Sequence, residues 1–233
     1  MRKLLVLIFF VCSLYTNAQQ ILGAWETTIR NNEGTNIKTI AIFTEGFYVF
    51  TNFKASDGEF ISTSGGSWSM ENNQLKCLIE FHYLHPKDVG TSFSEDLRVS
   101  ENTLQFSHET FTRIDNGRPG ALQGAWLMSG RKRNGELQSR DTSRPRKNMK
   151  ILSGTRFQWI AYNTETKQFM ATGGGTYTTI DGKYTENIEF FSRDASRVGM
   201  ELQFDYNLVD GNWHHSGKSS KGNPIYEIWS QRN

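Results

Sequence analysis

The chain carries one sequence pattern twice. Gly23-Ala24-Trp25 returns as Gly124-Ala125-Trp126, and residues 43–107 align with residues 152–216 at a constant offset of 109 without a gap. The matched residues include Phe60, Gly65, Gly66, Ile79 and Glu80 in the first copy and Phe169, Gly174, Gly175, Ile188 and Glu189 in the second. A fixed offset that keeps aromatic residues and glycines indicates a duplicated folding unit. Positions that differ in chemistry between the copies are therefore candidates for function.

Short stretches of alternating polarity fill both copies. In the first copy they cover residues 38–43, 47–53, 59–70, 75–83, 92–99, 103–107 and 110–114, after a first strand that starts at Trp25. Strands of this length and spacing are typical of an all-β barrel or sandwich, and eight strands can close a barrel. We expect two tandem antiparallel eight-stranded barrels, at residues 19–115 and 121–233. Residues 116–120 form the predicted linker, since four of its five positions are Asn, Gly or Pro.

The first 18 residues have the features of a secretory signal peptide. Arg2 and Lys3 give a positive start, residues 4–14 are apolar, and Thr16-Asn17-Ala18 is a small-residue cleavage site. The apolar stretch is too short to cross a bilayer, and no later stretch is long enough. We therefore expect a secreted or periplasmic chain with no membrane span.

The pattern resembles a known group of folds. A Gly-x-Trp motif that opens an eight-stranded meander, with a late basic residue (Arg113, then Arg232), is similar to the lipocalin and wider calycin group. The segments at residues 157–164, 173–177 and 184–194 are similar to lipocalin-like secreted proteins of the Bacteroidota. The resemblance implies a Trp that plugs one end of each barrel, with an Arg packed across it. Members of this largely uncharacterised family often accompany polysaccharide-degradation systems, and an oligosaccharide dehydratase role has been proposed for relatives.

Charge separates the two halves. Residues 19–118 carry 8 basic and 13 acidic residues, and residues 119–233 carry 16 and 11, so a neutral mature chain divides into −5 and +5. This asymmetry predicts either an anionic partner for the second half or docking between the two barrels. Nucleic acid is not an expected partner for an exported chain without net charge. The sequence leaves the oligomeric state open.

The second copy gains polar residues where the first is apolar. Residues two apart in a strand share a face, so the apolar set Leu75, Cys77, Ile79 and Phe81 becomes Tyr184, Glu186, Ile188 and Phe190. Leu104 and Phe106 become Trp213 and His215, whereas His214 should point outward. We therefore expect Tyr184, Glu186 and His215 inside the second barrel. The alternative is a satisfied polar cluster, for example Glu186 with His215, that only fixes packing.

Two further changes concern basic residues. Phe47, Val49 and Phe53 become Arg156, Gln158 and Tyr162, and an inward Arg156 would clamp a carboxylate or sulfate, whereas an outward one would be solvated surface. The second copy also has eight more residues before its third strand, within a stretch at 131–150 that has eight basic and two acidic residues. This stretch is either a basic lid or a solvated charge run.

These residues predict an enzyme that acts on an acidic, uronate-containing oligosaccharide by eliminating water or an alkoxide. His215 is the predicted base, Tyr184 the acid and Glu186 the group that orients the imidazole. The predicted substrate-binding residues are Arg156, Trp159, Tyr162, Trp213 and His214. The alternatives are a hydrolase that uses Glu186 and a non-catalytic module that binds an oligosaccharide or a small apolar ligand. No cofactor is predicted. No metal is predicted either, because no Cys/His spacing fits a zinc site and His214 and His215 point to opposite faces of a strand.

Overall fold

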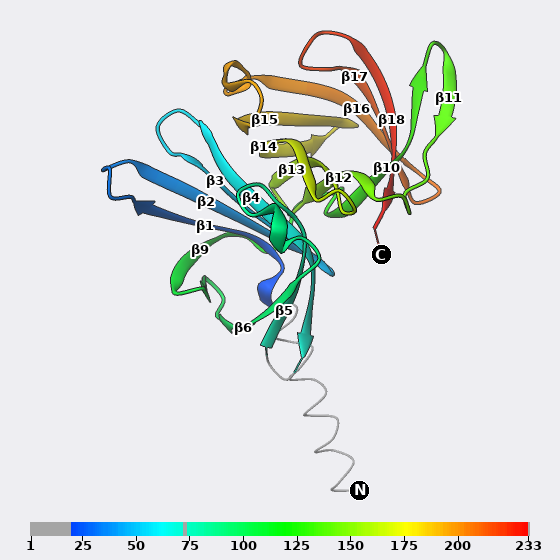
Figure 1. Ribbon diagram of the computed structural model, residues 1–233. Coiled ribbons are helices and arrows are strands. Elements are labelled where there is room, and N and C mark those ends of the chain that lie inside the picture. Colours follow the sequence, from blue (N-terminus) through cyan, green and yellow to red (C-terminus); the bar gives the residue numbers. More distant parts are fainter. Residues whose placement is uncertain (1–19, 72–73, 233) are drawn as a thin grey trace, which may run out of the picture.

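The computed structural model describes residues 20–71 and 74–232 and confirms the predicted fold class, an all-β chain folded into two antiparallel barrels (Figure 1). The predicted signal peptide at residues 1–18 lies outside the described residues. Within the described part, no helix is long and apolar enough to cross a membrane.

The first barrel is nearly closed, and the strand that would close it is interrupted. Its order is β6-β5-β4-β3-β2-β1-β9-β8-β7. The strands are β1 (Gly23–Arg30), β2 (Asn36–Thr44), β3 (Phe47–Lys54), β4 (Phe60–Glu71), β5 (Gln74–His82), β6 (Ser92–Asp96), β7 (Arg98–Val99), β8 (Thr103–Phe106) and β9 (Glu109–Asp115). Leu97 separates β6, which pairs with β5, from β7, which pairs with β8. The ring is therefore nearly closed, with a short gap in the pairing between β6 and β8.

The second barrel is a complete ring. Its strands are β10 (Gly124–Arg133), β11 (Glu136–Ser139), β12 (Arg146–Leu152), β13 (Arg156–Asn163), β14 (Gln168–Ile180), β15 (Lys183–Phe191), β16 (Glu201–Val209), β17 (Asn212–Lys218) and β18 (Pro224–Gln231). Pairing of β10 with β18 closes eight of these strands. The ninth, β11, pairs only with the end of β10, and this hairpin projects on the side away from the first barrel (Figure 1).

Equivalent glycines bend both barrels at the same place. The pairing register shifts between Gly65 and Gly66 in β4 and between Gly174 and Gly175 in β14. A Cβ on Gly66 or Gly175 would lie 2.0 Å from the carbonyl oxygen of Leu78 or Asn187. Only glycine lets the two backbones approach this closely at a bulge. The duplicated Gly-Gly pair is therefore required by the bend.

The repeated tryptophans are buried in equivalent positions of the two barrels. Trp25 and Trp126 are buried, and their indole N–H groups donate to the carbonyls of Ile21 and Leu122 at 2.8 and 2.9 Å. The guanidinium of Arg113 lies 3.9 Å from the centre of the Trp25 ring, which agrees with the Arg–Trp packing that the family resemblance implies. Arg232 does not repeat this arrangement, because it lies over Phe47 of the first barrel at 4.2 Å.

One face of each barrel packs against the other barrel. Phe53 stacks on Phe190 with ring centroids 5.1 Å apart, and Thr51 donates a 2.7 Å hydrogen bond to the Gln158 side chain. The apolar cluster at this contact joins Ile40, Ile42, Val49 and Phe81 to Leu127, Met149, Ile151 and Ile160. The expected inward position of Phe190 is therefore wrong. The bulge opposite Gly174 and Gly175 interrupts the alternation of β15 and turns Phe190 onto the first barrel.

Candidate functional site

A buried ion pair lies at the centre of the second barrel. Lys150 on β12 donates to Glu186 on β15, with Nζ and Oε1 2.9 Å apart, and each side chain is only 6% exposed. Lys150 Nζ also lies 4.8 to 5.3 Å from the ring centres of Tyr184, Trp213 and Trp229. Aromatic faces attract a cation, so these rings hold the ammonium group in addition to the carboxylate.

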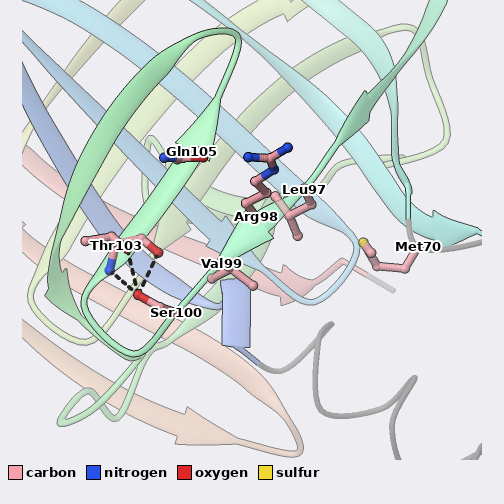
Figure 2. Close-up of a pocket in the computed structure, with 7 residues that line it drawn as sticks. All are labelled: Met70, Leu97, Arg98, Val99, Ser100, Thr103 and Gln105. Carbon is pink, nitrogen blue, oxygen red and sulfur yellow. Dashed lines mark hydrogen bonds between the residues drawn. The ribbon is translucent and has the colours of Figure 1, made fainter.

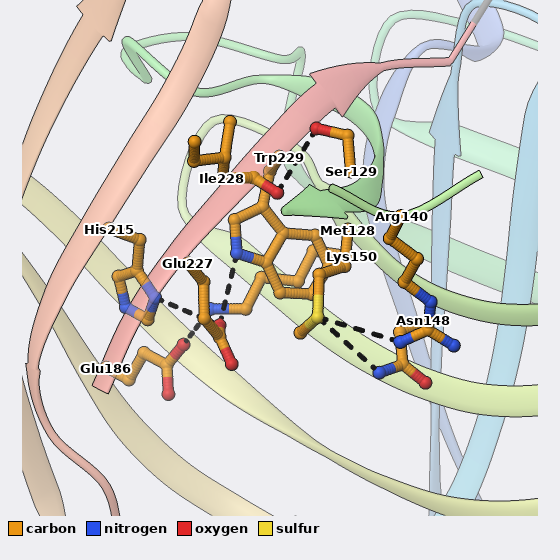
Figure 3. A network of polar contacts seen from close by, with 10 residues as sticks. All are labelled: Met128, Ser129, Arg140, Asn148, Lys150, Glu186, His215, Glu227, Ile228 and Trp229. Carbon is orange, nitrogen blue, oxygen red and sulfur yellow. Dashed lines mark hydrogen bonds and ion pairs between the residues drawn. The ribbon is translucent and has the colours of Figure 1, made fainter. Parts of the chain in front are cut away.

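A second carboxylate holds the buried imidazole. His215 on β17 is 2% exposed, and its Nδ1 lies 3.3 Å from Oε2 of Glu227 on β18, which also accepts from Trp229 Nε1 at 3.2 Å (Figure 3). Burial, followed by the positive charge of Lys150, lowers the pKa of His215 below its ordinary value of 6.5. Burial alone would raise the pKa of Glu227, but His215, Lys150 and Trp229 together bring it below the ordinary value. The site therefore holds a neutral imidazole beside an ionised carboxylate at neutral pH.

Three polar atoms in this cluster make no hydrogen bond of standard length and angle among the described residues: Nε2 of His215, the Tyr184 hydroxyl, which faces the Glu186 carboxylate, and Nε1 of Trp213. Burial, and secondly the negative charge of Glu186, raises the pKa of Tyr184 well above its ordinary value, so the phenol stays protonated. A buried polar group without a partner costs roughly 1–3 kcal/mol. Three such groups in one interior favour a site that receives a polar ligand or water.

Buried and partly buried aromatic side chains surround the cluster. Trp213 is fully buried and meets Trp126 edge to face at 5.9 Å. Six hydrophobic side chains that pack on the cluster are only partly buried and are called its rim: Trp159, Phe191, Met200, Leu202, Tyr206 and Ile225. Trp159 and Trp213 therefore both belong to this interior, Trp213 as a fully buried side chain and Trp159 as a partly buried one in the rim.

Arg156 and Tyr162 do not belong to it, and neither orientation considered for Arg156, an inward clamp or solvated surface, is observed, because Arg156 is buried against the first barrel. Their neighbours on β13, Phe157 and Trp159, face the interior, so strand alternation turns Arg156 and Tyr162 toward the first barrel. Arg156 pairs with Glu189 at 2.5 Å and with Glu26 of the first barrel at 4.0 Å. The Tyr162 hydroxyl donates to Glu80 of the first barrel at 2.7 Å.

The predicted partner of His215 is also wrong. Glu186 pairs with Lys150, and Glu227 orients the imidazole instead. His214 points outward, as strand alternation requires, and its Nδ1 lies 2.7 Å from the Tyr226 hydroxyl. This outward position separates His214 from the interior cluster, although the sequence places it among the substrate-binding residues.

Sequence reasoning missed Lys150 and Glu227. The 109-residue offset extends back to Ala41, whose counterpart is Lys150, but the basic composition of residues 131–150 makes Lys150 look like part of that stretch. That stretch is neither a loose lid nor a disordered run, because β10, β11 and β12 cover most of it. Glu227 faces His215 across the β17–β18 pairing, as Glu109 faces Phe106 in the first barrel. A register drawn through the last strands would have identified it.

Two cavities lie on the first barrel, remote from this cluster. One of about 330 Å³ is lined by Met70, the residues 97–100, Thr103 and Gln105 (Figure 2). The other, of about 530 Å³, follows the gap between β6 and β8. Within the described residues, no group of three or more His, Cys, Asp or Glu side chains is placed to hold a metal ion.

Residues 121–232, which make up the second barrel, match the model of a family described as a domain of unknown function (DUF4488). No curated protein matches the chain.

Proposed function

We propose that the second barrel catalyses elimination on an acidic, uronate-containing oligosaccharide, as an exported lyase of the dehydratase type with a calycin-like fold. The observation that carries the proposal is the His215 imidazole. Glu227 holds its Nδ1, burial keeps it neutral, and its Nε2 has no partner in the part of the chain that the structure describes. This is the arrangement of an oriented general base.

The neighbouring groups supply the other parts of an elimination. His215 Nε2 removes the proton on the carbon next to the substrate carboxylate, and the electron pair forms a carbon–carbon double bond as the adjacent carbon–oxygen bond breaks. Tyr184 gives its proton to the departing oxygen. The His215 imidazolium then loses its extra proton to water, and the Tyr184 phenolate takes a proton from water, so both groups return to their starting states. Lys150 has three N–H donors and gives one to Glu186, so two remain for the substrate carboxylate.

Lys150 thus takes the role that the sequence suggested for Arg156. A positioned base and acid contribute roughly 10²–10⁴-fold, and a cation on the developing enolate adds a term of similar or larger size. The reacting groups are almost fully buried, so entry of a sugar requires the rim of Trp159, Phe191 and Ile225 to move aside.

A non-catalytic binding module is the second candidate. The half-buried Trp159 and Phe191, whose rings meet at 5.5 Å, offer aromatic surface on which a sugar ring or a flat apolar ligand can stack. In that case Lys150 and His215 only orient the ligand, and the ligand is recovered unchanged.

Absorbance distinguishes the two functions. Elimination from a uronate produces a 4,5-unsaturated product that absorbs in the ultraviolet. We expect this signal with uronate oligosaccharides, a loss of at least about 100-fold in His215→Ala and Tyr184→Phe, and little change in the outward variant His214→Ala. Absence of the signal on every acidic oligosaccharide tested would reject the lyase. A signal that survives both interior substitutions would reject the site.

A further inference from the structure

Three arginines gather where the β10–β11 hairpin meets β12. Arg131 is on β10, Arg140 follows β11, and Arg146 begins β12. Arg131 and Arg146 lie close enough to Arg140 to lower its pKa, after the larger effect of burial. In the described part of the chain none of the three forms an ion pair, and the nearest pair in this segment joins Arg144 to Asp141. Glu227 is the cross-strand neighbour of Arg131, but its carboxylate is held by His215 and Trp229. The three guanidinium groups therefore leave a net positive surface that can bind an anion.

This surface is continuous with the interior of the barrel. Arg146, Asn148 and Lys150 are two apart on β12 and share its inward face. Nη1 of Arg140 lies 3.8 Å from the sulfur of Met128, which packs in the interior cluster (Figure 3). The Asn148 amide is best oriented with its nitrogen donating to the Lys147 carbonyl and its oxygen accepting from Arg140 Nη1, each at 3.2 Å. A line of polar groups thus runs from exposed Arg146 to buried Lys150.

The charge is not explained by attraction between the two barrels. The ion pairs that join the barrels use Arg156 with Glu26 and Arg232 with Glu80. The hairpin projects on the other side of the second barrel (Figure 1). The first barrel has no equivalent hairpin, because eight residues fewer separate its Gly-Ala-Trp motif from its third strand.

We propose that Arg131, Arg140 and Arg146 form a second anionic subsite, which binds the carboxylate or sulfate of a sugar unit next to the one held at Lys150. The ligand class, an acidic oligosaccharide, is taken from the proposed function. Arginine suits this role because its planar group binds carboxylate and sulfate through two hydrogen bonds. The subsite would make the protein select chains of at least two acidic units over a single uronate.

Binding to the full mature chain tests the subsite independently of catalysis. The probes are an unsulfated tetragalacturonate, the monomer galacturonate and the neutral maltotetraose, measured by calorimetry in His215→Ala so that no turnover occurs. We expect the tetramer to bind at least about tenfold more tightly than the monomer, and Arg140→Gln with Arg146→Gln to remove that advantage. The control is Lys54→Gln with Lys76→Gln, which removes the same charge from exposed positions of the first barrel.

Equal binding of tetramer and monomer would overturn the subsite, and so would equal weakening by the control pair. Tighter binding of single-stranded DNA or of anionic lipid vesicles than of the tetramer would also overturn it. Selective binding that depends on Arg140 and Arg146 but is accompanied by no ultraviolet product in the unsubstituted protein would keep the subsite and reject the lyase. An active lyase whose KM for the tetramer is unchanged in the arginine variant would reject the subsite alone.

Discussion

Removing one member of the Lys150–Glu186 pair should lower the free energy of unfolding strongly, whereas replacing both members with apolar side chains should lower it little. At 2.9 Å and an effective dielectric constant of about 20, Coulomb's law gives about 6 kcal/mol of attraction between two unit charges. Desolvation of both groups offsets most of this attraction. Removing one partner leaves the other charge buried at 6% exposure without compensation. We therefore expect Lys150→Met to lower the free energy of unfolding by about 3–5 kcal/mol.

The double variant separates charge from packing. The first barrel has Ala41 and Cys77 at the two positions, so the fold does not require charge there. We expect Lys150→Met with Glu186→Leu to recover most of the lost stability, because well-packed apolar side chains replace the pair at similar volume. The same double variant should be inactive and should not bind acidic sugars.

Urea unfolding followed by tryptophan fluorescence measures both effects, since Trp213 and Trp229 surround the pair. The matched control is Lys183→Met, which breaks the exposed cross-strand pair with Asp205 in the same barrel and should cost less than about 1 kcal/mol. If Lys150→Met costs no more than Lys183→Met, the reasoning about a buried, charged pair is refuted. If the double variant is no more stable than Lys150→Met, the loss comes from packing rather than from charge.

Three other predictions concern single positions. The pKa of His215 is lowered in the folded chain, so as the pH falls the unfolded chain binds this proton first. The free energy of unfolding should therefore decrease below pH 6.5, by up to about 1.4 kcal/mol per pH unit. In urea titrations His215→Phe should weaken this pH dependence, whereas the outward variant His214→Phe should not. Asp115 accepts from the backbone N–H groups of Gly117, Gly154 and Thr155, so Asp115→Ala should cost about 3 kcal/mol in the same assay, against well under 1 kcal/mol for the exposed Asp57→Ala. Gly175→Ala should lower the free energy of unfolding by about 3 kcal/mol, the upper end of the cost of overpacking, and should lower the melting temperature accordingly. An unchanged melting temperature would show that the bulge tolerates a side chain.

The sequence was sufficient where one physical rule decided the outcome. Alternation in a strand with one apolar face placed Tyr184, Glu186 and His215 in the interior, and the repeated Gly-Gly pair located the bend. Alternation could not orient the third strand, because both of its faces are buried. One face lines the barrel through Phe157, and the other packs on the first barrel through Tyr162.

The remaining errors have local causes. The bulge on β15 adds one residue between Ile188 and Phe190, and this reverses the side to which Phe190 points. Lys150 is buried, but its neighbours in the sequence are basic. The sequence alone therefore makes this interior cation look like part of a charged surface segment. Composition cannot distinguish a buried lysine from a surface lysine in such a stretch. The strand pairing can, because Trp126 pairs with Lys150 as Trp25 pairs with the buried Ala41.

The contact between the barrels predicts that they unfold as one unit. Phe53 and Phe190 stack across it, and Arg232 reaches Glu80 at 2.8 Å beside Tyr162. Burying each apolar side chain of this contact contributes roughly 1.5–3 kcal/mol, so the barrels should stabilise each other.

We expect a chain cut within the linker at 117–120 to elute as a single species in size-exclusion chromatography. Phe53→Asp should separate the two pieces, because it places a charge in the apolar contact without touching either barrel interior. Ile29→Asp makes the same chemical change at a side chain that is 44% exposed and should leave the pieces together. Pieces that part without any substitution would show that the barrels are independent. The interior cluster of the second barrel would then have to be stable without the first.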